Sequence, residues 1–128
     1  MIYTVNKKRP INLDLSTLKY PAMAIASILH RISGLVLFLL LPLMLYFLHL
    51  SLGGADAFAN LQVTLASPYS KLLLWAFVAA LIYHVIAGIR HLLMDLGIGE
   101  HLEEGRRSAV FVIALSIILT LLLGVWIW

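Results

Sequence analysis

The chain has 128 residues, of which 62% are hydrophobic and only 12% are charged, so its polar side chains are too few to cover a water-soluble globule. It contains no cysteine, which excludes disulfides, iron–sulfur ligation, zinc fingers and a covalently attached c-type haem within this chain. The formal net charge of +3 would suit a nucleic-acid partner, but the basic residues are not interleaved with aromatic residues on one polar surface, so we expect none.

The N-terminal segment is polar up to Lys19 and contains Asn12 and Asp14 before any long apolar run begins. That is not the layout of a signal peptide, and Pro10 and Asp14 interrupt the segment too much for a mitochondrial transit peptide. We therefore expect a protein of the bacterial inner membrane.

Three later segments are apolar over lengths that cross a hydrocarbon core, which takes about 20 residues of helix. They run from about residue 22 to 50, from 69 to 94 and from 108 to 128. The sequence thus predicts an all-α integral membrane protein with three transmembrane helices and a single membrane-anchor domain over residues 1–128. Pro42 should at most kink the first helix.

The first helix carries a polar cluster near its start, although polar side chains inside a membrane span are costly. Ser27, His30 and Arg31 stand at i, i+3 and i+4, which places all three on one face within a single turn. A hydroxyl, an imidazole and a guanidinium that point together can hold an anion or a carbonyl oxygen. The alternative is that His30 and Arg31 only reach out to lipid headgroups, and spacing alone does not separate the two.

The connection between the first and second helices contains Gly53 and Gly54 and closes with Ser67 and Pro68. These residues predict a turn-rich loop that leads into the start of the next helix. We assign this loop no function.

The second helix carries another polar stripe, since His84, Gly88, His91 and Asp95 fall at i, i+4, i+7 and i+11. His84 lies roughly 16 Å from Asp95 at about 1.5 Å of rise per residue, which puts a neutral imidazole near mid-membrane. A haem iron is one of the few partners that use the lone pair of such an imidazole, and Gly88 would let a flat macrocycle lie close to the helix. The alternative is a His84 hydrogen-bonded to a neighbouring helix, with Gly88 in ordinary helix contact.

No other histidine lies at the depth of His84; the remaining ones are His30, His49, His91 and His101. If the iron takes two histidine ligands, the second must therefore come from another chain. Arg31, His30 and His91 gather toward one side of the membrane and could pair there with the haem propionates, because buried carboxylates need cationic partners.

The connection from residue 95 to 107 is charged and of mixed sign, which predicts a solvated loop with a helix start at Ser108. Asp95 either relays a proton to a buried site or forms an ion pair with Arg90 or Arg106. The chain contains no Gly-rich phosphate loop, no serine nucleophile with a base and no hydrolytic carboxylate pair, so we expect no catalytic residue that acts in this chain alone.

With three crossings, the N-terminal segment and the second connection lie on the same side of the membrane. That side holds eight of the nine Lys and Arg residues, namely Lys7, Lys8, Arg9, Lys19, Arg31, Arg90, Arg106 and Arg107. The other side holds only Lys71. Because cytoplasmic loops are enriched in Lys and Arg, we expect a cytoplasmic N-terminus and a periplasmic C-terminus anchored by Trp126 and Trp128.

Two motifs of the chain resemble a known family. Arg9-Pro10 precedes Ser27–Ser33, which reads SILHRIS, and His84–Asp95 reads HVIAGIRHLLMD. In residue type and spacing, both are similar to the signatures of the cytochrome b large membrane-anchor subunits of bacterial succinate dehydrogenase, the succinate:quinone oxidoreductase also called complex II. The likeness extends over essentially the whole chain, including its length and its three-helix layout.

The resemblance implies roles that spacing alone leaves open. His84 matches the axial ligand of a haem b whose second ligand is a histidine of a smaller hydrophobic anchor subunit, so the chain would be half of a two-subunit haem-binding helix bundle. Ser27 and Arg31 match residues of the ubiquinone site, which the smaller anchor and the iron–sulfur subunit complete. His30 and Arg31 also match residues near the haem propionates. Together with His91 and Gly88 of the stripe, these residues make up the expected haem site.

In the family, succinate is oxidised at FAD in a flavoprotein subunit, and electrons pass along iron–sulfur clusters to ubiquinone. FAD and the clusters would therefore belong to partner subunits only. Two alternatives remain from the sequence: the anchor of a quinol:fumarate reductase, whose haem-free version His84 argues against, and a small membrane scaffold protein without a redox role.

Overall fold

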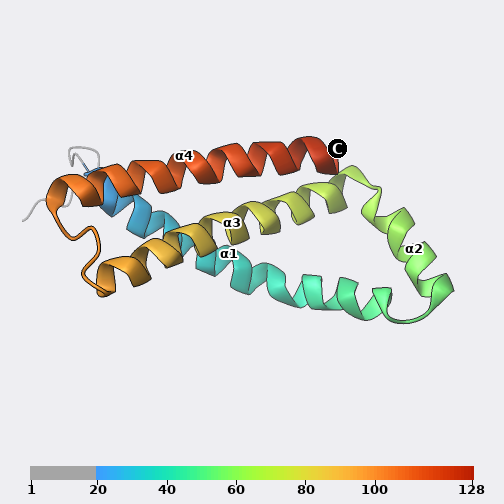
Figure 1. Cartoon of the computed structure of the whole chain (residues 1–128). Helices are drawn as coiled ribbons and strands as arrows, with labels where there is room; N and C mark the ends of the chain where they lie inside the picture. Colours follow the sequence, from blue (N-terminus) through green and yellow to red (C-terminus); the bar gives the residue numbers. More distant parts are fainter. Residues whose placement is uncertain (1–19) are drawn as a thin grey trace, which may run out of the picture.

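The computed structural model describes residues 20–128, which form four helices (Figure 1). Three of them, α1 (Ala22–Ser51), α3 (Pro68–Asp95) and α4 (Leu102–Ile127), are long and apolar enough to cross a membrane. The fourth, α2 (Ala55–Leu65), is short and connects α1 to α3. The predicted all-α fold with three transmembrane helices is confirmed. The basic residues up to Lys19 and the Arg9-Pro10 motif lie outside the described residues.

The helix α2 corrects the prediction of a turn-rich loop between α1 and α3. Gly54 precedes α2 with φ at 106°, a conformation that glycine adopts without strain. The connection therefore turns before α2, and it turns again at Ala66 and Ser67 before α3. Asp56 lies in the first turn, where a carboxylate is favoured by the helix dipole, and Leu61 is buried at 4% exposure. Leu61 is the only buried residue of α2, and a single buried position is too weak a periodic signal to read from the sequence.

The start of α4 also differs from prediction, because the helix begins at Leu102 and not at Ser108. His101 is the extended residue before the helix, and Glu103 and Glu104 occupy its first turn, where the helix dipole favours acidic side chains. Glu103 forms an ion pair with Arg107 one turn later, with 2.8 Å between nitrogen and oxygen. The charges that suggested a solvated loop instead stabilise a helix end.

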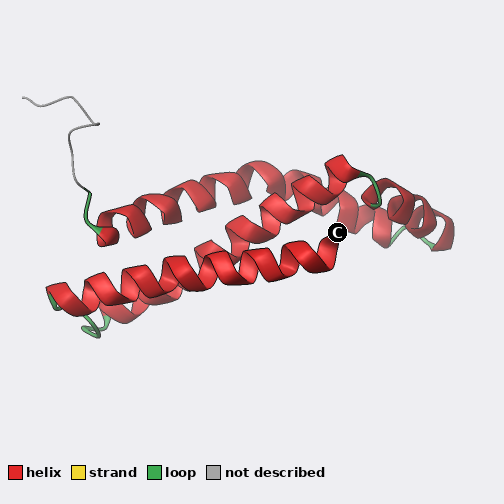
Figure 2. Ribbon diagram, turned by 90° about the horizontal axis from the view of Figure 1, so that it is seen from above, coloured by secondary structure: helices red, strands yellow, loops and turns green. Residues whose placement is uncertain are grey.

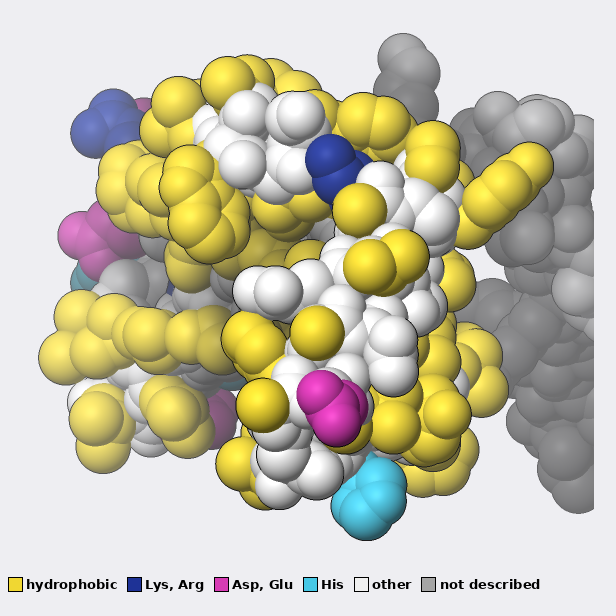
Figure 3. Space-filling view, turned by 90° about the vertical axis from the view of Figure 1, so that its right-hand side faces the viewer, with side chains coloured by type: hydrophobic (Ala, Val, Ile, Leu, Met, Phe, Trp, Pro, Cys, Tyr) yellow, Lys and Arg dark blue, Asp and Glu magenta, His cyan; other side chains and the backbone are white. Residues whose placement is uncertain are grey.

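The three long helices alternate in direction along the chain, so that the start of α1, the end of α3 and the start of α4 lie at the same end of the bundle (Figure 1). Seen from above, the three long helices extend in roughly the same direction (Figure 2). α1 is one continuous helix from Ala22 to Ser51 and includes Pro42. The other end, which carries α2, is covered mainly by hydrophobic side chains with a few scattered charges (Figure 3). α3 packs against both α1 and α4.

Small residues make up most of the buried positions where the long helices meet. They are Ala26 and Ser33 on α1, Ala80 and Ala87 on α3, and Gly105, Ala109 and Ser116 on α4. Because lipid tails are as apolar as leucine, helices in a membrane gain little from burying large side chains and much from close backbone approach. Most of the large apolar side chains described therefore point outward, as Phe38 and Trp126 do.

Candidate functional site

Three histidines and a glycine meet where α1 crosses α3. The imidazole of His30 stacks on that of His84, with ring centroids 4.2 Å apart and ring planes at 18°. The His91 ring lies 5.1 Å from that of His30, at 49°. A Cβ added to Gly88 would lie 3.5 Å from Nε2 of His30. The stripe predicted on α3 thus faces the polar cluster of α1, through His30.

The His84 ring is held by α1 through one of its two nitrogens. Nδ1 lies 3.2 Å from the backbone oxygen of His30 and 3.1 Å from Oγ of Ser33. Within the described residues, Nε2 makes no hydrogen bond. A carbonyl oxygen can only accept, so this contact favours the tautomer in which Nδ1 carries the proton and Nε2 keeps its lone pair. Such an imidazole is both bonded to a neighbouring helix and able to bind a metal, so the two alternatives for His84 are compatible.

Ser33 is a site residue that the sequence patterns did not single out. It is only 6% exposed, and its hydroxyl donates to the backbone oxygen of His30 at 2.7 Å. The sequence does contain a feature that could have pointed to Ser33, because it lies within the same short motif as His30 and is a polar residue on an apolar helix. A serine that bonds to its own helix is common, however, and only the fold shows that its oxygen also reaches His84.

The structure leaves Ser27 half-buried and Arg31 exposed, and neither has a hydrogen bond or an ion pair within the described residues. Next to them, the hydroxyl of Tyr83 donates to the backbone oxygen of Ala26 at 3.0 Å and ties α3 to this part of α1. The other described helices therefore do not engage Ser27 and Arg31 through hydrogen bonds or ion pairs.

The structure contradicts the alternative in which Asp95 forms an ion pair with Arg90. Arg90 is 6% exposed and donates from Nε to Oγ of Ser108 and from Nη2 to the backbone oxygen of Gly105, each at 3.0 Å. Five residues at about 100° each place Arg90 and Asp95 on different faces of the helix, so one turns to α4 while the other does not. Asp95 ends α3, is exposed, and makes no ion pair within the described residues, with Arg106 or otherwise.

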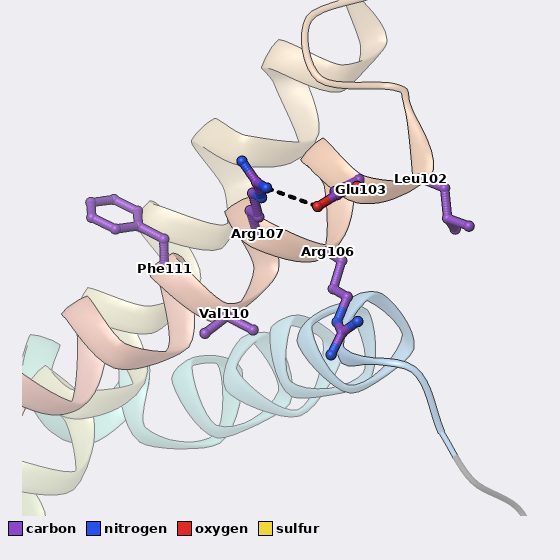
Figure 4. A pocket seen from close by; sticks show the side chains of 6 residues that line it. All are labelled: Leu102, Glu103, Arg106, Arg107, Val110 and Phe111. Carbon is purple, nitrogen blue, oxygen red and sulfur yellow. Dashed lines mark hydrogen bonds and ion pairs between the residues drawn. The ribbon is translucent and has the colours of Figure 1, made fainter.

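An open groove of about 840 Å³ lies on the outer face of α4 and contains none of the predicted haem or quinone residues. Figure 4 shows its side chains, with the ion pair between Glu103 and Arg107 and the side chain of Arg106 pointing away from it toward α1. Its apolar floor, formed by Val110 and Phe111 among others, is exposed to whatever surrounds the helix. We place the candidate functional site where α1 crosses α3 and not in this groove, because the polar side chains of the two helices contact one another at that crossing.

The donor set at the crossing fits a group that needs a single protein ligand from this chain. Within residues 20–128, no His, Asp and Glu side chains are grouped so that three of them could chelate a metal ion. One imidazole presents an Nε2 that makes no hydrogen bond within the described residues, and Gly88 adds no side chain to α3 beside the ring of His30. A planar macrocycle whose iron takes one ligand here and one from another chain is compatible with both features.

Comparison with known proteins identifies relatives that match nearly the whole chain. The family model described as "Succinate dehydrogenase/Fumarate reductase transmembrane subunit" matches residues 5–123. The chain is similar to the succinate dehydrogenase cytochrome b556 subunit of Coxiella burnetii, with 51% identity over 97% of this chain and 100% of that protein. It is 33% identical to the cytochrome b556 subunit of Paracoccus denitrificans, over 89% of this chain and 88% of that one. A cytochrome b560 subunit of Reclinomonas americana is 34% identical, over 94% and 88% respectively.

Proposed function

The chain belongs to the family of succinate dehydrogenase/fumarate reductase transmembrane subunits, and from that premise we propose that it anchors a succinate dehydrogenase in a bacterial inner membrane. In this proposal it shares a haem b with a smaller anchor subunit and forms part of the site where ubiquinone is reduced. The relatives named above are all succinate dehydrogenase subunits, which favours succinate oxidation over fumarate reduction.

The observation that carries the proposal is the environment of His84. Its Nδ1 is engaged by α1 and its Nε2 makes no hydrogen bond within the described residues, so the ring is oriented with Nε2 placed to bind iron. When bound, haem b would supply one-electron redox chemistry. Gly88 keeps the surface of α3 flat beside it, while His30, His91 and Arg31 lie toward the end of the bundle where cationic groups would hold the propionates.

Ser27 and Arg31 would contribute to the quinone site. Reduction of a quinone builds negative charge on its carbonyl oxygens, and a hydroxyl donor together with a fixed cation stabilises that charge. Ser27 is half-buried and Arg31 exposed near the start of α1, close to where protons can arrive from water. Asp95, exposed at the end of α3, is a candidate for the proton route.

The proposal requires partner subunits. The second haem ligand would come from a histidine of the smaller anchor. In this chain His30 stacks flat on the His84 ring and His91 lies beside His30, while His49 is near the end of α1 and His101 precedes α4. The smaller anchor and the iron–sulfur subunit would complete the quinone site, and a flavoprotein would hold FAD. With the basic end of the bundle in the cytoplasm, the exposed Trp126 and Trp128 would lie at the periplasmic interface.

The deciding experiment is to purify the complex through a tag on this chain and to record its optical spectrum and its companion subunits. We expect a b-type haem spectrum together with a second small hydrophobic subunit, an iron–sulfur subunit and a flavoprotein. His84→Ala should abolish or greatly reduce the haem absorbance. The matched control is His49→Ala, which replaces an exposed histidine near the end of α1 and should leave the spectrum unchanged. A lone, colourless protein would overturn the proposal and leave a non-redox scaffold as the function.

A further inference from the structure

The proposed function makes no use of Ser33 and Gly34, yet these two residues of α1 form the surface against which the His84 ring lies. Ser33 is buried, and its Oγ is 3.1 Å from Nδ1 of His84. Gly34 follows it at the ring edge, where an added Cβ would lie 3.1 Å from Cε1 and 3.5 Å from Nδ1. No other described residue offers the ring of His84 a polar side chain within hydrogen-bonding distance.

The hydroxyl of Ser33 has one hydrogen, and it is directed to the backbone oxygen of His30 at 2.7 Å. Only the lone pairs of Oγ are then left for Nδ1 of His84. The second atom facing Nδ1 is the carbonyl oxygen of His30, which can only accept. Nδ1 is thus surrounded by two acceptors, a setting in which it must carry the proton.

Gly34 determines how closely the ring can approach the helix. A Cβ at 3.1 Å from a ring carbon is tighter than ordinary van der Waals contact, so any side chain here would push the imidazole away from α1. Displacement would lengthen both contacts at Nδ1 at the same time. The serine therefore supplies the second acceptor at Nδ1, and the glycine sets the distance between the ring and α1.

We propose that Ser33 and Gly34 are a positioning pair that fixes the tautomer and the orientation of the His84 imidazole, so that Nε2 is presented to the haem iron. This inference rests on the proposed function, in which His84 is an axial ligand. Neither residue touches the iron. A hydrogen bond to the distal nitrogen of a ligating imidazole orients the ring and raises its basicity, and loss of such a partner typically weakens metal binding by about 10- to 100-fold.

The test uses the complete complex with its partner subunits and compares four variants. Ser33→Ala removes the acceptor but leaves the carbonyl of His30, so we expect about 10-fold weaker haem retention, the lower end of that range. We also expect a more positive midpoint potential and an altered electron paramagnetic resonance signal of the oxidised haem. Ser33→Thr keeps the hydroxyl and should restore all three values. Gly34→Ala should lower haem retention although the hydroxyl is still present.

The fourth variant, Ser116→Ala, is the matched control. Ser116 is as buried as Ser33, at 3% exposure, but lies on α4, and its hydroxyl has no hydrogen-bond partner within the described residues. Its replacement should leave haem binding, potential and resonance signal at wild-type values. If Ser33→Ala behaves like Ser116→Ala in all three measurements, the positioning role is refuted.

A measurement on the unmodified complex covers the case in which a variant does not assemble. Electron–nuclear double resonance of the oxidised haem should detect an exchangeable proton on Nδ1 of the ligating His84, and its absence would refute the inference by itself. Failure of the proposed function looks different. In that case the wild-type complex contains no haem, or it keeps its haem after His84→Ala.

Discussion

Replacing Tyr83 with phenylalanine tests whether α1 and α3 are joined beside the quinone residues as the structure indicates. The substitution removes one hydroxyl, which donates to the backbone oxygen of Ala26 at 3.0 Å, and keeps the aromatic ring. That oxygen belongs to α1 and also accepts a bond within the helix, so its other bond remains after the change. Nothing buried is left without a partner.

The expected cost is that of a single interhelical hydrogen bond in a membrane protein. Such bonds average about 0.6 kcal/mol and reach about 1.7 kcal/mol. We therefore expect Tyr83→Phe to lower the free energy of unfolding of the complex by about 1 kcal/mol, measured by titration with a denaturing detergent in mixed micelles. Because Ser27 follows Ala26 directly, the KM for ubiquinone should also rise while the haem spectrum stays the same.

The control for this prediction is Tyr46→Phe. Tyr46 is also on α1 but is 56% exposed, and within the described residues its hydroxyl forms no hydrogen bond to another helix. Its replacement should change neither stability nor KM. The reasoning fails if the two variants are indistinguishable, or if Tyr83→Phe costs more than about 3 kcal/mol, which is beyond what one such bond contributes.

Two further predictions concern the ligand sites. Ser27→Ala and Arg31→Ala should each lower ubiquinone reduction by about 10-fold or more, since each removes a group that stabilises developing charge, while succinate oxidation by an artificial acceptor stays intact. The control is Arg106→Ala, which removes the same charge from α4. Equal loss of both activities would contradict the quinone assignment. Gly88→Ala should leave assembly intact, because the new Cβ meets Nε2 of His30 at an ordinary 3.5 Å. Gly88→Leu should lower the haem-to-protein ratio without loss of the partner subunits, and an unchanged ratio would show that no macrocycle lies there.

The sequence predicted the three long helices well, because an apolar run of membrane-spanning length has no other stable form in lipid. The shared face of His84, Gly88 and His91 could also be predicted, since helical periodicity alone decides which residues share a face. That this stripe meets His30 could be expected only from the need of polar groups to find partners, and the structure shows the contact.

The remaining features depend on tertiary contacts or on competing local signals. The charges around Glu103 are typical of a loop and also of a first helical turn, and the ion pair to Arg107 favours the helix. The hydrogen-bond partner of Arg90 is Ser108 on another helix, and the distance between two helices cannot be predicted from residue spacing along the sequence. The orientation of Ser33 toward His84 is likewise a property of the crossing between α1 and α3.

The small residues at the buried positions where the long helices meet limit which substitutions this subunit can accept during evolution. Positions such as Ala87 and Ala109, at 1% and 0% exposure, accept little beyond a methyl group, whereas outward positions accept any of several aliphatic side chains. Substitutions should therefore accumulate on the outer surface, where one leucine-like residue replaces another with little effect on packing. The relative with 33% identity over 89% of this chain differs at enough positions for such substitutions to make up many of the differences.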